Sequence, residues 1–144
     1  MQQGEDRVFL PDMDSKELSV LSSEQIINSY DNTIIATDCF IDSIIKDIEN
    51  ENAILIYLSD PGESLGEGGE WLHGTDAPQL HKVAAWIWYS EEYSKHFEDK
   101  IALLQKNTNK PLSSDNLFYS IIDFSGLETR VFDPTKSWIY EEEN

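Results

Sequence analysis

The sequence predicts a layered α/β domain, in which helices cover a sheet of parallel strands. Three observations lead to this prediction. Apolar residues recur at helical intervals over roughly residues 23–50, two short apolar runs follow at 53–58 and 83–90, and further helical patterns start near Ser90 and Ser114. Helical and extended patterns thus alternate along the chain, which is typical of α/β folds.

The first predicted element is an amphipathic helix over roughly residues 23–50. Ser22 and Gln25 have the spacing of a capping box, in which each side chain bonds the backbone N–H of the other residue. The apolar and aromatic residues that share one helical face are Ile27, Tyr30, Ile34, Ile41, Ile45 and Ile48. We expect this face to pack on the sheet.

Two predicted strands follow the helix. Residues 53–58 (AILIYL) are apolar without alternation, which predicts a parallel-type strand covered on both faces. Residues 83–90 (VAAWIWYS) predict a second buried strand, and Trp86 and Trp88 are expected in the core. The 24 residues between the two runs form a long connection. Connections of that length in a compact domain are usually functional or disordered, so we expect the function here.

Two more helices complete the predicted domain. Ser90 is a predicted N-cap, and the helix after it would bury Tyr93, Phe97, Ile101 and Leu104. A third helix is predicted from near Ser114 to a stop at Gly126, with Leu117, Phe118, Ile121 and Ile122 as its apolar positions. Beyond it we expect one short strand. Residues 1–144 are predicted to form a single domain, with an irregular segment at 1–21 and an acidic tail at 139–144.

Composition excludes several classes of function. The formal net charge is −18, from 28 Asp and Glu against 10 Lys and Arg, whereas nucleic-acid binders need a basic face. Cys39 is the one cysteine, so neither an intrachain disulfide nor a thiolate metal cluster is expected. The chain shows neither a signal-peptide pattern nor a run of about 20 apolar residues. We therefore expect no export signal and no membrane span in this chain as written.

The long connection contains a candidate site. Asp60 lies just beyond the end of the first predicted strand, whose rigid backbone would hold a carboxylate at the sheet edge as a metal ligand requires. His73 could return an imidazole to the same point, and glycines between them allow tight turns. Zinc normally takes three or four protein ligands, however. These residues alone favour an acidic surface loop with a hydrogen-bonded histidine.

Residues 57–74 (YLSDPGESLGEGGEWLHG) nevertheless resemble the signature of the phosphoethanolamine transferases, which are members of the alkaline phosphatase and sulfatase superfamily. The family pattern is approximately Y-V-S-D-H-G-E-S-L-G-E-x-G-x-Y-L-H-G. Three other stretches agree with the family in order and spacing: residues 28–38 (NSYDNTIIATD), 77–90 (APQLHKVAAWIWYS) and 113–137 (SSDNLFYSIIDFSGLETRVFDPTKS). The resemblance covers roughly residues 22–138 and is to the C-terminal part of the family's soluble domain.

The resemblance implies a fold, a reaction and a location. The expected fold is part of the α/β/α sandwich of the alkaline-phosphatase-like (sulfatase) fold. The family lies at the periplasmic face of the inner membrane and transfers phosphoethanolamine from phosphatidylethanolamine to lipid A, core sugars or glucans. A threonine nucleophile beside zinc carries the phosphoryl group. By resemblance, Asp60 is a metal ligand and His73 lies near the metal or the substrate phosphate.

The chain also departs from the family. Pro61 occupies the position of a metal-binding histidine, and a pyrrolidine ring has no donor atom for zinc. The family's nucleophile and its glutamate ligand lie upstream of the matched region. The resemblance therefore assigns no catalytic residue to these 144 residues. We expect the chain alone to be inactive and not to hold zinc tightly.

Two alternatives remain open. The chain could be a non-catalytic pseudoenzyme subunit that retains the fold for binding, or an acidic interaction domain that binds a basic partner. Either a fragment or a subunit would leave a sheet edge and helix faces uncovered. We therefore expect self-association, or a second chain that supplies the missing N-terminal half.

Overall fold

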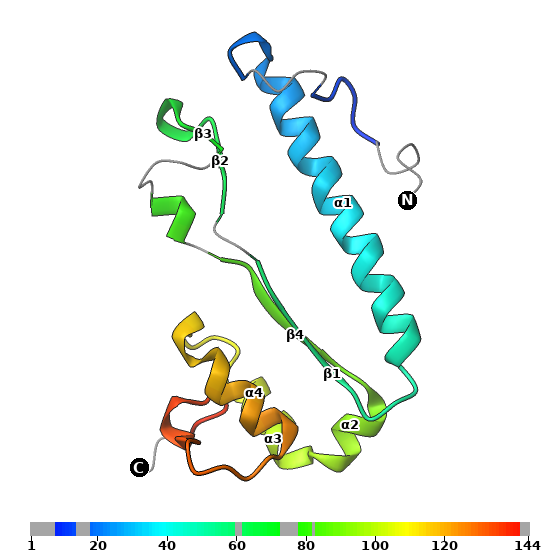
Figure 1. The fold of residues 1–144 in the computed structure, drawn as a ribbon, viewed down its shortest axis with the longest axis vertical. Helices are drawn as coiled ribbons and strands as arrows, with labels where there is room; N and C mark the ends of the chain where they lie inside the picture. Colours follow the sequence, from blue (N-terminus) through cyan, green and yellow to red (C-terminus); the bar gives the residue numbers. More distant parts are fainter. Residues whose placement is uncertain (1–7, 14–17, 60–61, 73–77, 82, 142–144) are drawn as a thin grey trace. The chain divides into compact units, whose positions relative to one another are not determined.

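The computed structural model describes residues 8–13, 18–59, 62–72, 78–81 and 83–141 (Figure 1). Contacts divide the chain into two compact units, which are described separately. Unit 1 consists of Met1–Ile48 and Leu55–Trp88, and unit 2 consists of Glu49–Ile54 and Tyr89–Asn144.

Unit 1 begins with the predicted long helix. Helix α1 spans Ser23–Ile48, within two residues of the expected end. The capping box is confirmed: the Gln25 N–H donates to Ser22 Oγ at 3.2 Å, and the Ser22 N–H donates to Gln25 Oε1 at 3.0 Å. These two bonds satisfy N–H groups that a helix start otherwise leaves without a partner.

The segment before α1 is held to the helix by polar side chains. Asn32 is buried, and its Oδ1 accepts from the Val8 and Phe9 N–H groups at 2.9 and 3.0 Å. Its Nδ2 donates to the Phe9 carbonyl at 3.0 Å, and Asn28 Nδ2 donates to the Pro11 carbonyl at 2.9 Å. A short 3-10 helix spans Leu18–Val20.

The two predicted strands pair with each other, but they run antiparallel. They are β1 (Ile54–Leu58) and β4 (Ala85–Tyr89), which form a two-stranded sheet. At one end, the Ser59 N–H donates to the Ala84 carbonyl at 2.9 Å; at the other, the Ser90 N–H donates to the Ala53 carbonyl at 2.9 Å. The end of each strand thus lies beside the start of the other. The parallel prediction is wrong, and the described part of the connection contains no α-helix that could carry a crossover between parallel strands.

The predicted burial of these strands is also wrong. Every side chain of β1 is half-buried, and β4 begins with exposed residues. Trp86, expected in the core, is 39% exposed and stacks on Tyr57 with ring centroids 5.2 Å apart. A continuous apolar run therefore marks a sheet that the described residues leave partly uncovered.

The long connection has structure of its own. A small antiparallel hairpin joins β2 (Ser64–Leu65) to β3 (Trp71–Leu72), with Ser64 opposite Leu72 and Leu65 opposite Trp71. Short 3-10 helices lie at Glu67–Gly69 and Pro78–His81. The described part of this connection is therefore an ordered substructure at the end of β1.

The described part of unit 2 contains three α-helices. They are α2 (Glu91–His96), α3 (Glu98–Asn107) and α4 (Leu117–Ser125). Ser90 is confirmed as the N-cap of α2, because its Oγ accepts from the Tyr93 N–H at 3.0 Å. The single helix expected after Ser90 is divided at Phe97, whose φ of −127° and ψ of 45° are not helical. Gly126 ends α4 with a φ of 68°, as predicted.

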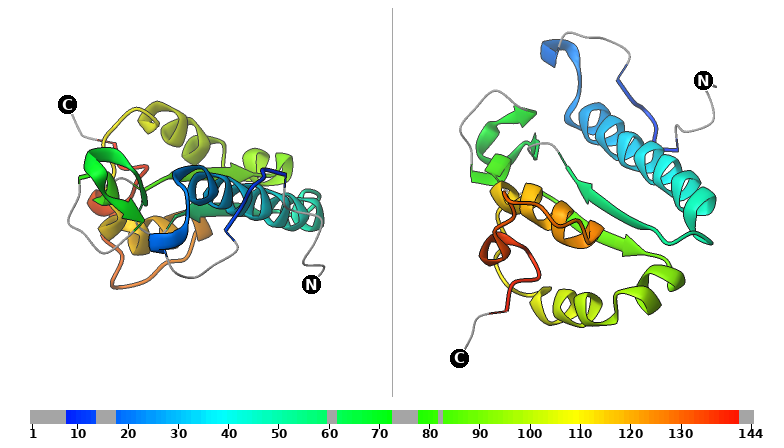
Figure 2. Two further views of the ribbon diagram at one scale, coloured as in Figure 1. Left: turned by 90° about the horizontal axis from the view of Figure 1, so that it is seen from above. Right: turned by 60° about the horizontal axis from the view of Figure 1, so that its bottom comes forward.

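The core of unit 2 is formed by the helices and the C-terminal segment, which folds back beside α4 (orange to red in Figure 2). Its buried hydrophobic residues are Tyr93, Ile101, Leu104, Ile122, Phe124, Trp138 and Ile139. Among the described residues after Gly126 there is a 3-10 helix at Pro134–Lys136 and no strand, so the short strand expected there is wrong. Side-chain bonds replace strand pairing: Asn107 Nδ2 donates to the Trp138 and Tyr140 carbonyls at 2.9 and 3.1 Å.

Candidate functional site

The residues that the sequence singled out for chemistry are not described by the structure. Asp60, Pro61 and His73 all lie outside the described residues. The roles of Asp60 as a metal ligand and of His73 beside the substrate therefore stay predictions. Their described neighbours Ser59 and Leu72 both line one pocket.

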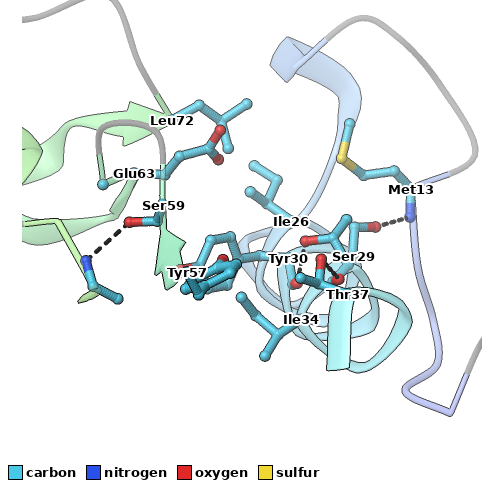
Figure 3. Close-up of a pocket in the computed structure, with 13 residues that line it drawn as sticks. Met13, Ile26, Ser29, Tyr30, Ile34, Thr37, Tyr57, Ser59, Glu63 and Leu72 are labelled. Atoms are coloured by element: carbon cyan, nitrogen blue, oxygen red, sulfur yellow. Dashed lines mark hydrogen bonds between the residues drawn. The ribbon is translucent and has the colours of Figure 1, made fainter. Parts of the chain in front are cut away.

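This pocket is a cavity of about 470 Å³ within unit 1 (Figure 3). Side chains from α1, from the end of β1 and from the hairpin face the same space. Its polar lining residues include Ser29, Tyr30, Thr33, Thr37, Tyr57 and Glu63. None of the described lining residues is Lys or Arg, so the walls are neutral or acidic.

Helix α1 supplies hydroxyl groups to one wall of the pocket. Thr33 Oγ1 donates to the Tyr30 carbonyl at 2.7 Å, and Thr37 Oγ1 donates to the Thr33 carbonyl at 2.8 Å. Ser29 Oγ accepts from the Met13 N–H at 2.6 Å. Because residues four apart lie on one helical face, these hydroxyls form a single stripe. Each of the two threonine hydroxyls donates its hydrogen to a backbone carbonyl of the helix, so its oxygen lone pairs remain available to accept hydrogen bonds.

The end of β1 is fixed by two hydrogen bonds to β4. The Ser59 N–H donates to the Ala84 carbonyl at 2.9 Å, and the Ala84 N–H donates to Ser59 Oγ at 2.9 Å. A reciprocal pair of this kind holds the last residue before position 60 in one orientation. The backbone that precedes the predicted ligand position is thus held in place, as a ligand position requires.

The hairpin depends on glycine. Gly66 has a φ of 105°, and a Cβ atom there would lie 2.9 Å from the Trp71 ring. Gly66 thus combines a left-handed backbone with a close approach that no other residue permits. The Leu65 N–H donates to Glu67 Oε2 at 2.6 Å, which closes the turn. The tight turning expected of the glycines is confirmed at this position.

Metal-binding groups are absent from the described part of the chain. No three His, Cys, Asp or Glu side chains of the described residues gather closely enough to hold an ion. His81 and His96 are both exposed, and His96 packs edge-on against the Phe97 ring at 4.7 Å.

The sequence reasoning missed the pocket itself. Its signal was present in the spacing of Ser29, Thr33 and Thr37, since four-residue intervals place hydroxyls on one helical face. What could not be read was that this face lies opposite Tyr57 and Glu63, because α1 and the hairpin are far apart in the chain.

Comparison with known proteins identifies the family. The family model described as Sulfatase matches residues 2–127. This chain belongs to the sulfatase family. The match covers the pocket and both strands of the β1–β4 sheet.

Phosphoethanolamine transferases are among the similar proteins. Phosphoethanolamine transferase EptA of Escherichia coli K12 is 36% identical over 135 residues, which cover 88% of this chain and 25% of that protein. The protein of the same name from Helicobacter pylori is 40% identical over 121 residues, 81% of this chain and 22% of that protein. The chain thus spans about a quarter of the length of these curated relatives.

A solved structure agrees with this result. The soluble domain of lipooligosaccharide phosphoethanolamine transferase A from Neisseria meningitidis superposes with a TM-score of 0.81 at 27% identity. The superposition covers 92% of this chain and 42% of that chain. The resemblance to phosphoethanolamine transferases and the partial alkaline-phosphatase-like α/β fold are confirmed. Within the described residues, every helix is too short or too polar to span a membrane.

Proposed function

We propose that this chain forms the C-terminal part of the soluble domain of a phosphoethanolamine transferase. The whole enzyme would transfer phosphoethanolamine from phosphatidylethanolamine to lipid A, a core sugar or a glucan at the periplasmic face of the inner membrane. The observation that carries the proposal is the match to the Neisseria soluble domain, which includes 92% of this chain but only 42% of that domain.

The two site residues would act at the end of β1. Asp60 would supply a carboxylate ligand, and the reciprocal bonds between Ser59 and Ala84 support this role because they hold the preceding backbone. His73 would lie near the transferred phosphate. His73 directly follows β3. The antiparallel register of the hairpin pairs Leu72 with Ser64, and Ser64 is four residues after Asp60.

The donor atoms of this segment do not fit a complete zinc site. Catalytic zinc takes three protein ligands and keeps one open position. Asp60 supplies one ligand, Pro61 supplies no donor atom, and the described residues offer no group of three. In the proposal, the remaining ligands and the threonine nucleophile therefore come from outside this segment, and the segment alone does not catalyse transfer.

Pro61 favours one alternative, a non-catalytic subunit. The family's histidine at this position is a ligand, and its loss would weaken any metal site even in a complete domain. In that case the segment would contribute the fold and the pocket but no turnover.

A chimera separates these readings. The matched part of the Neisseria soluble domain is replaced by this chain, once unchanged and once with Pro61→His, and both are assayed for release of phosphoethanolamine from phosphatidylethanolamine. The proposal expects activity from the Pro61→His chimera and none from the 144-residue chain alone, with or without that substitution. A folded Pro61→His chimera without activity would favour the non-catalytic subunit. Turnover by the chain alone would contradict the proposal.

A further inference from the structure

Helix α4 is apolar nearly all round. Its sequence LFYSIIDFS contains a single charged residue, Asp123. The buried residues of this helix are Ser120 and Phe124, which share one face, and Ile122, which lies on another side. Between these two sides lies an exposed strip, called here the outer face of α4, which carries Phe118 and Ile121, 55% and 49% exposed.

The rotation of α4 is fixed by hydrogen bonds from its buried residues to other elements. Phe124 is 1% exposed, and its carbonyl accepts from the Tyr93 hydroxyl at 2.5 Å. Ser120 Oγ accepts from the Trp138 N–H at 2.9 Å and donates to the Asn116 carbonyl at 2.9 Å. The helix cannot turn about its axis without breaking these bonds, so the outer face cannot enter the core of unit 2.

The exposed side chains on the outer face form one apolar surface. Phe118 and Ile121 are three residues apart and therefore neighbours on the helix. Leu127, just beyond the helix, is also 64% exposed. A helix that is hydrophobic on all sides is normally buried, and an exposed apolar surface marks a contact with another protein surface. Because neither Phe118 nor Ile121 carries charge, this face suits an apolar partner and not a basic one.

The structural match indicates what this partner is. More than half of the Neisseria soluble domain has no counterpart in this chain, since the match covers 42% of that domain. We propose that the outer face of α4 docks against that remaining part of the sulfatase domain. The inference rests on the proposed function and specifies one of the surfaces through which the segment joins the rest of the enzyme.

The test compares the same substitution in two settings. Ile121→Glu and, separately, Phe118→Glu are made in the isolated 144-residue chain and in the folded Pro61→His chimera with the Neisseria domain. Ala102→Glu, which adds the same charge at an exposed position of α3, is the matched control. The midpoint of thermal unfolding is measured for each. In the chimera each outer-face variant should lower it by about 5 °C or more, and in the isolated chain by less than about 2 °C.

A milder variant protects the test against failure to fold. Ile121→Ala should lower the midpoint of the chimera by about 3 °C and leave the isolated chain unchanged. Equal losses in both settings would overturn the proposal, because the face would then be covered within these 144 residues. So would an isolated chain that is dimeric by sedimentation and becomes monomeric with Ile121→Glu, because the occupant would be a second copy.

The activity of the chimera separates this inference from the proposed function. An active Pro61→His chimera whose stability is insensitive to the outer-face variants would overturn the docking surface and leave the proposed function standing. A chimera that does not fold would contradict the proposed function, and the docking surface would fall with it.

Discussion

The two units of the molecule differ in how completely they are packed. Of the nine described hydrophobic residues that are buried, Ile26 and Leu80 lie in unit 1 and seven lie in unit 2. Unit 1 instead carries the half-buried strand β1, the pocket and the connection that contains Asp60 and His73. The predicted chemistry therefore lies on the less completely covered unit. Unit 2 has a dense interior and one helix face that remains open.

The difference has a physical basis. Unit 2 is formed mainly by consecutive helices, whose contacts come from nearby residues and can satisfy one another locally. Unit 1 holds two strands of a sheet, and a two-stranded sheet is marginal without further strands or a covering layer. Helices satisfy their backbone hydrogen bonds internally, whereas the edge of a two-stranded sheet leaves backbone groups without strand partners.

The largest expected effect comes from the core of unit 2. Phe124→Ala should reduce the free energy of unfolding by about 3–5 kcal/mol, since it leaves a large cavity beside Tyr93. Ile26→Ala in unit 1 should cost about 2–3 kcal/mol, at the low end for buried isoleucine, because its surroundings can relax toward the pocket. Urea denaturation followed by tryptophan fluorescence measures both. A larger loss for Ile26→Ala would reverse the comparison between the units.

The next largest effect is expected in the hairpin of unit 1. Gly66→Ala should destabilise the hairpin by about 3 kcal/mol, because it combines an unfavourable φ of 105° with a contact of 2.9 Å to Trp71. Gly68→Ala is the matched control. Its φ is 64° and its Cβ would meet nothing within 4 Å, so the cost should be about 1 kcal/mol. The change is measured by hydrogen exchange of two backbone amides. The N–H of residue 66 donates to the Glu70 carbonyl, and the N–H of residue 69 donates to the carbonyl of residue 66.

Equal loss of protection in the two glycine variants would show that backbone conformation alone controls this turn. Loss of protection that spreads to the amides of α3 and α4 would mean that the two units unfold together.

The smallest of the three effects is a dependence on alkaline pH. Burial, with a smaller contribution from the charge of Asp123, raises the pKa of Tyr93 to about 12. The unfolded tyrosine ionises near 10, so this stabilisation is complete below about pH 10 and is lost as pH rises toward 12. The loss should be on the order of 2 kcal/mol.

Tyr93→Phe removes the ionisable hydroxyl and so tests this contribution to the pH dependence, although it also removes the hydrogen bond to the Phe124 carbonyl. Denaturant midpoints at pH 8, 10, 11 and 12 should fall less steeply for Tyr93→Phe than for the unchanged chain. Tyr140→Phe, in the C-terminal segment, should keep the steep fall. Identical slopes for the unchanged chain and Tyr93→Phe would show that other groups cause any alkaline unfolding.

Helix boundaries could be predicted because their determinants are local. The capping pair of Ser22 and Gln25, the N-cap Ser90 and the stop at Gly126 all act within a few residues of the chain. The break at Phe97 was missed, because the periodic apolar residues on both sides continue through it. Strand direction and burial were predicted wrongly for a different reason. An apolar run such as residues 54–58 shows that a strand needs cover, but not which neighbour pairs with it or which surface covers it.

The candidate site divides in the same way. The resemblance of residues 57–74 to a phosphoethanolamine transferase signature was visible in the sequence, as was the proline at position 61, because side-chain chemistry is written in residue identity. The pocket that joins the Ser29–Thr37 stripe to Tyr57 and Glu63 required the tertiary structure.

The sequence by itself determined the family, the positions of the helices and the donor atoms that this segment can and cannot offer. Only the tertiary structure decided the antiparallel pairing of β1 and β4, the pocket and the exposure of the outer face of α4. The physical reason is that caps, turns and ligand atoms depend on neighbouring residues. Pairing and burial depend on surfaces that meet across long chain separations.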